Sequence, residues 1–171
     1  GVPVTPESSL AMSAVWRATN LISQLGGALP LHVYEGDETV DSKLLADPHP
    51  DMTPLELWRL SYAHRCLWGN SYFQKMRNGG GEILSLMPIS PWRMKVGNAK
   101  KPIPDNPTGK IFEFTKDNGE TEVFTPREIF HVPGFNYDGV TGVSPVRLAT
   151  NAIGLSIAAE QSASRLFASG N

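Results

Sequence analysis

Three of the Ser-Pro and Thr-Pro pairs divide this chain of 171 residues into its main segments: Thr5-Pro6, Thr53-Pro54 and Ser144-Pro145. A Ser or Thr hydroxyl caps the unpaired N–H groups at a helix start, and proline suits the first helical position because its missing N–H needs no partner there. Glu56 lies three residues after Thr53 and completes a capping box. Apolar residues follow each pair at helical spacing. The sequence therefore predicts three helices and where each one begins.

The three predicted helices differ in length and in how they end. The first runs to residue 25 before Gly26-Gly27, and the second runs to residue 68 before Gly69. The third follows Gly142 and continues for about 24 residues, or about 36 Å at a rise of about 1.5 Å per residue. Its many alanines and few charges predict that protein covers more than one of its sides.

Short β-strands are predicted outside these helices. Residues 29–35 form a strand with a weak return at 39–40, and residues 41–53 form a connector. Between the second and third helices, runs rich in β-branched and aromatic residues alternate with turns, of which residues 117–119 are the strongest hairpin signal. These runs predict strands at residues 71–77, 82–87, 92–96, 110–115, 120–124 and 129–132.

This order of elements predicts an α+β fold. Two helices flank a small mixed or antiparallel sheet, and the third helix projects from it. We expect residues 1–143 to form the α+β body and residues 144–171 to form the long C-terminal helix.

Charge and cysteine content narrow the class of protein. The formal net charge is −2, whereas domains that grip DNA carry clustered Lys and Arg that neutralise phosphates. Cys66 is the only cysteine, so no internal disulfide can form, and we expect a reducing compartment and a buried thiol. No apolar run approaches the ~20 residues of a membrane span. We expect an intracellular protein with no membrane partner.

No motif in the chain indicates catalysis, a cofactor or a metal. Ser144 is followed by proline and valine, whereas a nucleophile elbow needs glycine two residues after its serine, so Ser144 is interpreted as a helix cap. Residues 79–81 are glycines that precede neither a helix nor a lysine, which predicts a hairpin tip and not a phosphate loop. Scattered carboxylates give nuclease or glycosidase chemistry no support. The histidines lack metal-ligand spacing: His32, His49, His64 and His131.

Two interpretations stay open for the basic residues. They form a solvated surface or pair with acidic residues of a neighbouring subunit: Arg59, Arg65, Arg77, Arg93, Lys95, Lys100 and Lys101. The tryptophans are interpreted as anchors of the core or of an interface, and not as platforms for base stacking: Trp16, Trp58, Trp68 and Trp92.

An ordered series of motifs resembles the N-terminal part of the portal proteins of lambda-like, long-tailed bacteriophages. Each motif is short, but their order and spacing extend over nearly the whole chain. The matching positions are Val15, Trp16, Ile22, residues 29–34, His49-Pro50, Gly69-Asn70, Tyr72, Leu86, Pro88, residues 129–131, Gly142, Ser144-Pro145, Ala149, Ile153 and residues 167–171.

The resemblance implies a structural subunit of a ring of about twelve copies at the unique capsid vertex. Such a ring docks terminase and tail, and forms the channel through which double-stranded DNA passes without specific binding. The implied partners are further copies of the chain, the major capsid or scaffold protein, terminase and tail adaptor proteins. The implied location is the virion, and the host cytoplasm during assembly. Another head–tail adaptor or capsid-associated module is the alternative, and a hydrolase or nuclease is the third hypothesis.

Within that family, residues 1–143 are similar to the wing, and residues 144–171 to the start of the stem or the link between wing and stem. Portal proteins are usually more than twice this length, so the clip, channel loop and crown have no counterpart in this sequence. We predict a contact between neighbouring subunits at small residues of the third helix, where two chains can approach closely. The predicted contact residues are Ala149, Ala152, Ile153, Ala159 and Ala163.

Overall fold

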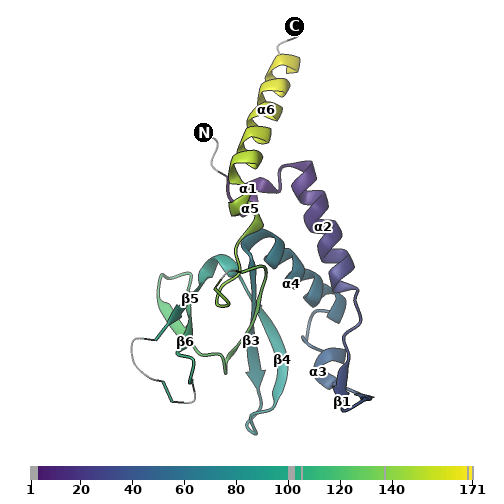
Figure 1. Cartoon of the computed structure of the whole chain (residues 1–171), viewed down its shortest axis with the longest axis vertical. Helices are drawn as coiled ribbons and strands as arrows, with labels where there is room; N and C mark the ends of the chain where they lie inside the picture. The colour runs from purple at the N-terminus through teal and green to yellow at the C-terminus, as the bar shows by residue number, and fades with distance from the viewer. Residues whose placement is uncertain (1–3, 100–102, 105, 137, 169, 171) are drawn as a thin grey trace.

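A computed structural model gives the fold, in which one long helix projects from a body of helices and β-sheets (Figure 1). The structure describes residues 4–99, 103–104, 106–136, 138–168 and 170. The expected α+β class is confirmed, with small antiparallel sheets flanked by helices and a long helix at the C-terminal end.

Two helices of the body, α2 (Ser13–Gly27) and α4 (Pro54–Trp68), pack along each other. The first helix ends at the predicted glycine pair, but two residues later than predicted, because α2 includes both Gly26 and Gly27 and has its C-cap at Ala28. A Cβ added to Gly27 would lie 2.7 Å from the backbone nitrogen of Arg59. These glycines therefore allow the two helices to approach closely.

The predicted helix caps are present in the structure. The Thr5 hydroxyl accepts a hydrogen bond from the Ser8 N–H at 3.1 Å. The Thr53 hydroxyl accepts from the Glu56 N–H at 3.3 Å, while the Glu56 carboxylate accepts from the Thr53 N–H at 2.8 Å. Gly69 ends α4 in the left-handed conformation with a φ of 79°. The boundaries of α4 thus follow from local sequence alone.

The first predicted helix is interrupted. The structure has a short α1 (Pro6–Ser9), then a turn at residues 10–12, then α2. In one continuous helix Leu10 and Met12, two positions apart, would not share a face. Both side chains nevertheless pack against the same apolar cluster at the end of α4. The turn brings both of them to that cluster.

A short helix that the sequence analysis missed lies inside the predicted connector. It is α3 (Lys43–Ala46), capped by the Ser42 hydroxyl, which accepts a hydrogen bond from the Leu45 N–H at 3.3 Å. Leu44 packs against the core beneath α4. This tertiary contact holds a helix of one turn that local sequence signals only weakly.

The strands form three sheets, and every pairing among the described residues is antiparallel. The sheets are the hairpin β1–β2, a sheet of order β4–β3–β8, and a sheet of order β5–β6–β7. A 3₁₀ turn, η1 (Pro91–Arg93), precedes β5. The bounds are β1 Val33–Glu35, β2 Glu38–Val40, β3 Asn70–Arg77, β4 Ile83–Ile89, β5 Met94–Asn98, β6 Lys110–Thr115, β7 Thr121–Phe124 and β8 Ile129–Pro133.

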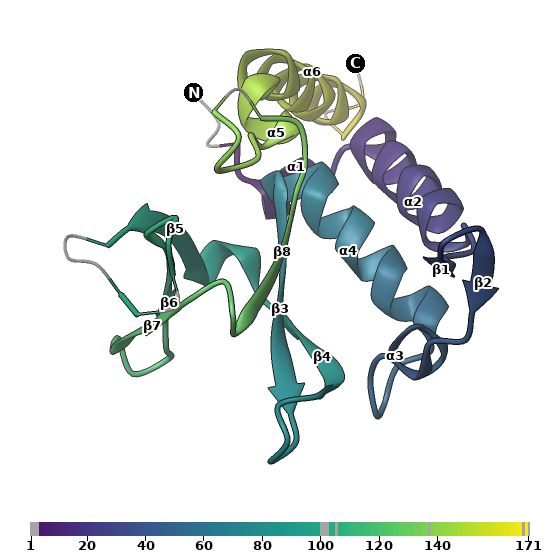
Figure 2. The ribbon, with the colours of Figure 1, turned by 60° about the horizontal axis from the view of Figure 1, so that its bottom comes forward.

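The body is layered, and Figure 2 shows the β5–β6–β7 sheet on one side, the β4–β3–β8 sheet in the middle, and α4 and then α2 on the other side. Consecutive residues of the central strand β3 face opposite layers, as in any strand. Tyr72 is buried between the two sheets with Phe112 and Ile129. Phe73 is buried beneath α4 against Leu57. β3 therefore joins the two cores.

The third predicted helix is two helices, α5 (Pro145–Leu148) and α6 (Thr150–Ala168), with a break at Ala149. Val146 and Ile153 are buried against the end of α4, so the first turns belong to the packing of the body. Residues 158–168 are all exposed, and Figure 1 shows this part of α6 extending away from the body.

Candidate assembly site

Three separate segments of the sequence meet at the root of the projecting helix. They are Gly69-Asn70 at the end of α4, the strand β8, and residues 142–145 at the start of α5. Hydrogen bonds join residues 61 and 72 positions apart in the sequence. We call this region the junction, and it is the candidate functional site.

Asn70 is the centre of the junction and is 6% exposed. Its side-chain Nδ2 donates to the carbonyl of Gly142 at 2.8 Å, and its Oδ1 accepts from the Gly142 N–H, also at 2.8 Å. One carboxamide therefore pairs with both backbone groups of one residue, as a neighbouring strand would. This pairing holds the chain in place two residues before the cap of α5.

His131 and Lys110 extend this network into both sheets. The Lys110 ammonium lies 3.1 Å from His131 Nδ1 and donates to the Val140 carbonyl at 3.1 Å. An ammonium only donates, so Nδ1 is the acceptor, and the Nε2–H donates to Asn70 Oδ1 at 2.9 Å. Burial, and then the nearby Lys110 charge, lower the pKa of His131 to about 4. A neutral imidazole is the form that this network requires.

Ser144 connects two helices. Its Oγ accepts a hydrogen bond from the Arg147 N–H at 3.2 Å, which caps α5, and its hydroxyl donates to the Leu67 carbonyl in the last turn of α4. The Gly69 carbonyl accepts from the Gly134 N–H at 2.8 Å. Carbonyls at a helix C-terminus lack partners within the helix. The loop before α5 thus supplies the partners that the end of α4 needs.

Two glycines of the junction are needed for close backbone contact. A Cβ on Gly142 would overlap the Gly69 carbonyl oxygen, and a Cβ on Gly69 would lie 2.6 Å from the Ser144 nitrogen. Gly69 also has a positive φ, which side chains disfavour. Both glycines were predicted as helix boundaries, and their mutual contact is a tertiary feature that no local pattern indicates.

The predicted subunit-contact residues occupy different environments. Ala152, Ala159 and Ala163 are exposed along α6, and Ala149 is half-buried. Ile153 is 7% exposed and packs in the core of its own chain. Ile153 therefore lies inside the subunit, and three alanines of the predicted contact lie on its surface.

Large apolar side chains are also exposed on α6 and on α2. On α6, Leu155 is 74% exposed and Phe167 is 84% exposed, and on α2 Leu25 is 62% exposed. Exposed apolar side chains that lie together on a surface are typical of interaction sites. The signal in the sequence was the many alanines and few charges of the third helix, which predicted that protein covers more than one of its sides.

Tryptophan and basic residues are distributed between core and surface. Trp58 packs edge-to-face on Phe73, whereas Trp16 and Trp92 are more than half exposed. Trp92 also lies against Trp68, with ring centroids 5.0 Å apart. Trp58 is therefore an anchor of the core, and the role of the exposed tryptophans as interface anchors stays a prediction.

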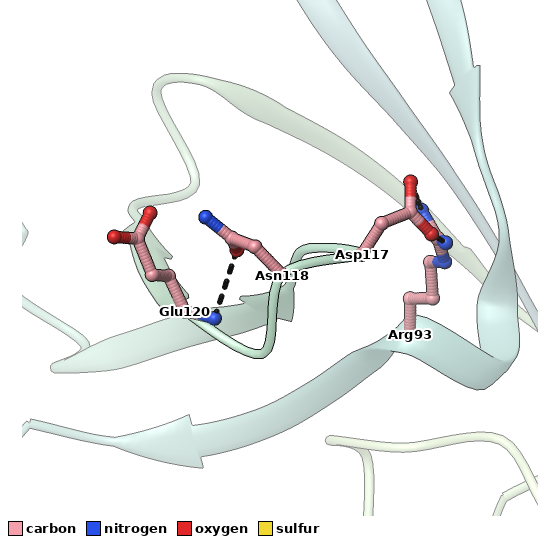
Figure 3. Close-up of polar contacts among 4 residues, drawn as sticks. All are labelled: Arg93, Asp117, Asn118 and Glu120. Carbon is pink, nitrogen blue, oxygen red and sulfur yellow. Dashed lines mark hydrogen bonds and ion pairs between the residues drawn. The ribbon is translucent and has the colours of Figure 1, made fainter.

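Several of the predicted basic residues bond within their own chain. Figure 3 shows Arg93, the last residue of η1, paired with Asp117 in the β6–β7 hairpin, where Asn118 Oδ1 accepts from the Glu120 N–H at 3.0 Å. Arg59 donates to Asn20 at 2.6 Å. The side chains of Lys100 and Lys101 lie outside the described residues. Arg59 is exposed, as the solvated-surface interpretation predicts, and the pairing of these residues with a neighbouring subunit stays a prediction.

Cys66 is half-buried, so the prediction of a buried thiol is wrong. It lines a groove between α2 and the root of α5, together with Val15, Ile22 and Ile153. Burial is still sufficient to raise the pKa of the thiol. The groove leaves one side of Cys66 uncovered because α2 and α5 do not meet there.

Among the described residues, no three His, Cys, Asp or Glu side chains are grouped as metal ligands. Within the same residues, no helix has the length and apolarity that a bilayer span requires.

The comparison with known proteins identifies the family. A family model described as phage portal protein matches residues 13–171. The chain belongs to the phage portal protein family. The portal protein of Enterobacteria phage HK97 is 31% identical over 178 residues, covering 98% of this chain, and the probable portal protein of Streptomyces phage phiC31 is 31% identical over 184 residues, covering 99% of it. The chain spans about 40% of the length of these curated relatives.

Solved structures show the same portal fold. A chain from the neck of the empty gene transfer agent particle, computed with C6 symmetry, has a TM-score of 0.78 at 23% identity, with 97% of this chain and 46% of that chain covered. The crystal structure of an HK97-family phage portal protein from Corynebacterium diphtheriae has a TM-score of 0.68 at 16% identity, with 95% and 49% covered. The junction described above therefore lies within a portal fold.

Proposed function

We propose that this chain supplies part of a structural subunit of a portal ring at the capsid vertex, through which DNA is packaged and ejected. The match of the portal family model to residues 13–171 carries this proposal. The portal family is structural, and we propose that the chain has no enzymatic activity. The exposed apolar side chains of α2 and α6 support a role in assembly.

In this proposal residues 1–143 form the wing, and residues 144–171 form the start of the stem or its link to the wing. A closed ring needs two different faces on each subunit and a rotation that closes. We propose a ring of about twelve copies; the neck of the native gene transfer agent particle was computed with C12 symmetry. The exposed alanines Ala152, Ala159 and Ala163 are where neighbouring helices approach in this arrangement.

The proposed partners follow from the position of such a ring. They are further copies of the chain, the major capsid or scaffold protein, terminase, the tail adaptor proteins, and double-stranded DNA that passes without specific binding. A formal charge of −2 suits a passage that does not retain DNA. The proposed location is the virion, with assembly in the host cytoplasm.

The test is the assembly state of the full-length protein, measured by light scattering with negative-stain images of the same sample. Rings of about twelve subunits with a central hole are the expected result. A species that stays monomeric at high concentration, with and without scaffold protein, would contradict the proposal. Rings of a different size, made by a gene product no longer than this chain, would instead indicate the adaptor alternative.

A further inference from the structure

We infer that the hydrogen-bond network of Lys110, His131, Asn70 and Gly142 sets the direction in which α6 leaves the body, and thereby the number of subunits in the ring. We call these four residues the clamp. The inference rests on the proposed ring function, and assigns to the clamp a role that the overall portal fold does not specify.

The apolar contacts at the root of α6 do not fix its direction by themselves. Val146 and Ile153 pack against Leu67, but apolar packing of a few side chains is weakly directional. Hydrogen bonds require near-linear geometry and distances within a few tenths of an ångström. The two bonds of 2.8 Å between Asn70 and Gly142 therefore add direction at this root, beside the bond from Ser144 to the Leu67 carbonyl.

The clamp is anchored in the buried core of the body. Asn70 is the first residue of the central strand β3, and the His131 ring stacks on Tyr72 with centroids 4.7 Å apart and planes 12° apart. Tyr72 is 2% exposed between the two sheets. Lys110 brings in β6, the central strand of the second sheet, and its bond to Val140 ends in the loop before α5. Hydrogen bonds from both sheets thus help to fix the position of Gly142.

A small change in the direction of α6 is sufficient to change the number of subunits in the ring. Neighbouring subunits are rotated by about 30° in a ring of twelve and by about 28° in a ring of thirteen. At about 1.5 Å per residue, the 19 residues of α6 span about 28 Å. A tilt of about 2° at the root moves the far end of such a helix by about 1 Å. A clamp of buried hydrogen bonds is the kind of device that can hold an angle this closely.

The first experiment measures subunit number by native mass spectrometry on rings of the full-length protein. Asn70→Ala removes both bonds to Gly142, and His131→Phe keeps an aromatic ring against Tyr72 while removing the bonds to Lys110 and Asn70. Phe124→Leu is the matched control, since Phe124 is buried in the same core, 7% exposed, without a clamp contact. We expect one subunit number for the wild type and the control, and a mixture, with at least a tenth of the rings in a second class, for both clamp variants.

A second measurement reads the direction of α6 without a ring. Spin labels at Lys95→Cys on β5 and Ser162→Cys on α6, both exposed sites, are placed in a Cys66→Ser background of the unassembled full-length subunit. Electron–electron double resonance then gives the distance distribution between them. We expect the distribution to shift or at least double in width with Asn70→Ala or His131→Phe, and to stay unchanged with Phe124→Leu.

The outcomes separate this inference from the proposed function. A wild-type protein that forms no ring contradicts the proposed function. The spin-label distances then still test whether the clamp sets the direction of α6. Clamp variants with the subunit number and the distance distribution of the wild type overturn the inference and leave the portal function intact. An equal change in the Phe124→Leu control also overturns it, because general loss of stability would then explain the result.

Discussion

The hydroxyl of Ser144 donates a hydrogen bond to the carbonyl of Leu67, which lies 77 residues earlier in the sequence. The same oxygen accepts from the Arg147 N–H. The last turn of α4 and the first turn of α5 therefore share one capping side chain. This relationship makes the end of one helix depend on the start of the other, and it places the projecting helix against the body.

Replacing Ser144 by alanine removes both bonds. A lost N-cap and an unsatisfied carbonyl together predict a loss of about 1–2 kcal/mol in the free energy of unfolding. The measurement is the urea unfolding midpoint and slope. Ser162→Ala is the matched control, because the exposed Ser162 hydroxyl bonds only to the Ala158 carbonyl of its own helix. A Ser144→Ala variant as stable as the control would show that the shared cap contributes nothing.

Gly142→Ala tests the close contact in the junction. The added Cβ would overlap the Gly69 carbonyl oxygen, so the loop must move and the bonds to Asn70 must lengthen. Overpacking at such a site predicts a destabilisation of about 1–3 kcal/mol. Gly79→Ala is the control, because nothing lies within 4 Å of its added Cβ, and its stability is expected to stay within about 0.5 kcal/mol of the wild type. Equal stability of the two variants would contradict the described contact.

The stability of the fold is expected to fall below neutral pH. Burial is the main cause that lowers the pKa of His64 and of His131 from 6.5 to about 4. The folded state therefore favours neutral imidazole, and its full contribution is present above pH 6.5. As the pH falls from 6.5 to about 4, the unfolded chain takes up protons that the folded chain does not, and stability decreases. The slope is at most about 1.4 kcal/mol per pH unit for each histidine.

Urea midpoints across this pH range measure the effect. The His64→Phe variant, which keeps an aromatic ring beside Trp68, should lose about half of the slope that arises from the two histidines. A midpoint that does not change between neutral pH and about pH 5 would contradict the assignment of two neutral buried imidazoles.

Local sequence predicts the parts of the fold that are stabilised by contacts between residues close together in the chain. The capping box of Thr53 and Glu56 gave the start of α4, and the turn at residues 117–119 gave the β6–β7 hairpin. The breaks at residues 10–12 and at Ala149 escaped prediction, because they serve contacts with the end of α4 that periodicity does not encode. The one-turn helix α3 escaped prediction because the contact that holds it, Leu44 against the core beneath α4, is also tertiary.

The candidate site was predicted as separate pieces and not as a unit. Gly69, Ser144 and Gly142 were identified as helix boundaries, and His131 as a strand histidine. Nothing local pairs Asn70 with Gly142, because their hydrogen bonds span 72 residues. Only the folding of β3 against the loop before α5 brings them together, so the network became visible in the structure alone.

The reactivity of Cys66 should report the packing at the root of α6. Its thiol is half-buried and burial raises its pKa, so we expect it to react with an aromatic disulfide reagent at least tenfold more slowly than free cysteine. Ile153→Ala removes a side chain that lines the same groove and should speed the reaction. Ile83→Ala, in the core beneath α4, is the control. Equal rates for the two variants would show that the groove does not limit access.

The predicted contact between neighbouring helices can be tested at one exposed alanine. Ala159 lies on the exposed part of α6, so a leucine there costs the isolated subunit little. If two helices approach at this residue, the larger side chain separates them, and ring formation by the full-length protein should fall at least tenfold at equal concentration. Glu160→Gln, at the next exposed position, is the control and should leave assembly unchanged. Rings of normal yield and size from Ala159→Leu would move the subunit contact away from this face of α6, whereas failure of both variants would point to the helix end as a whole.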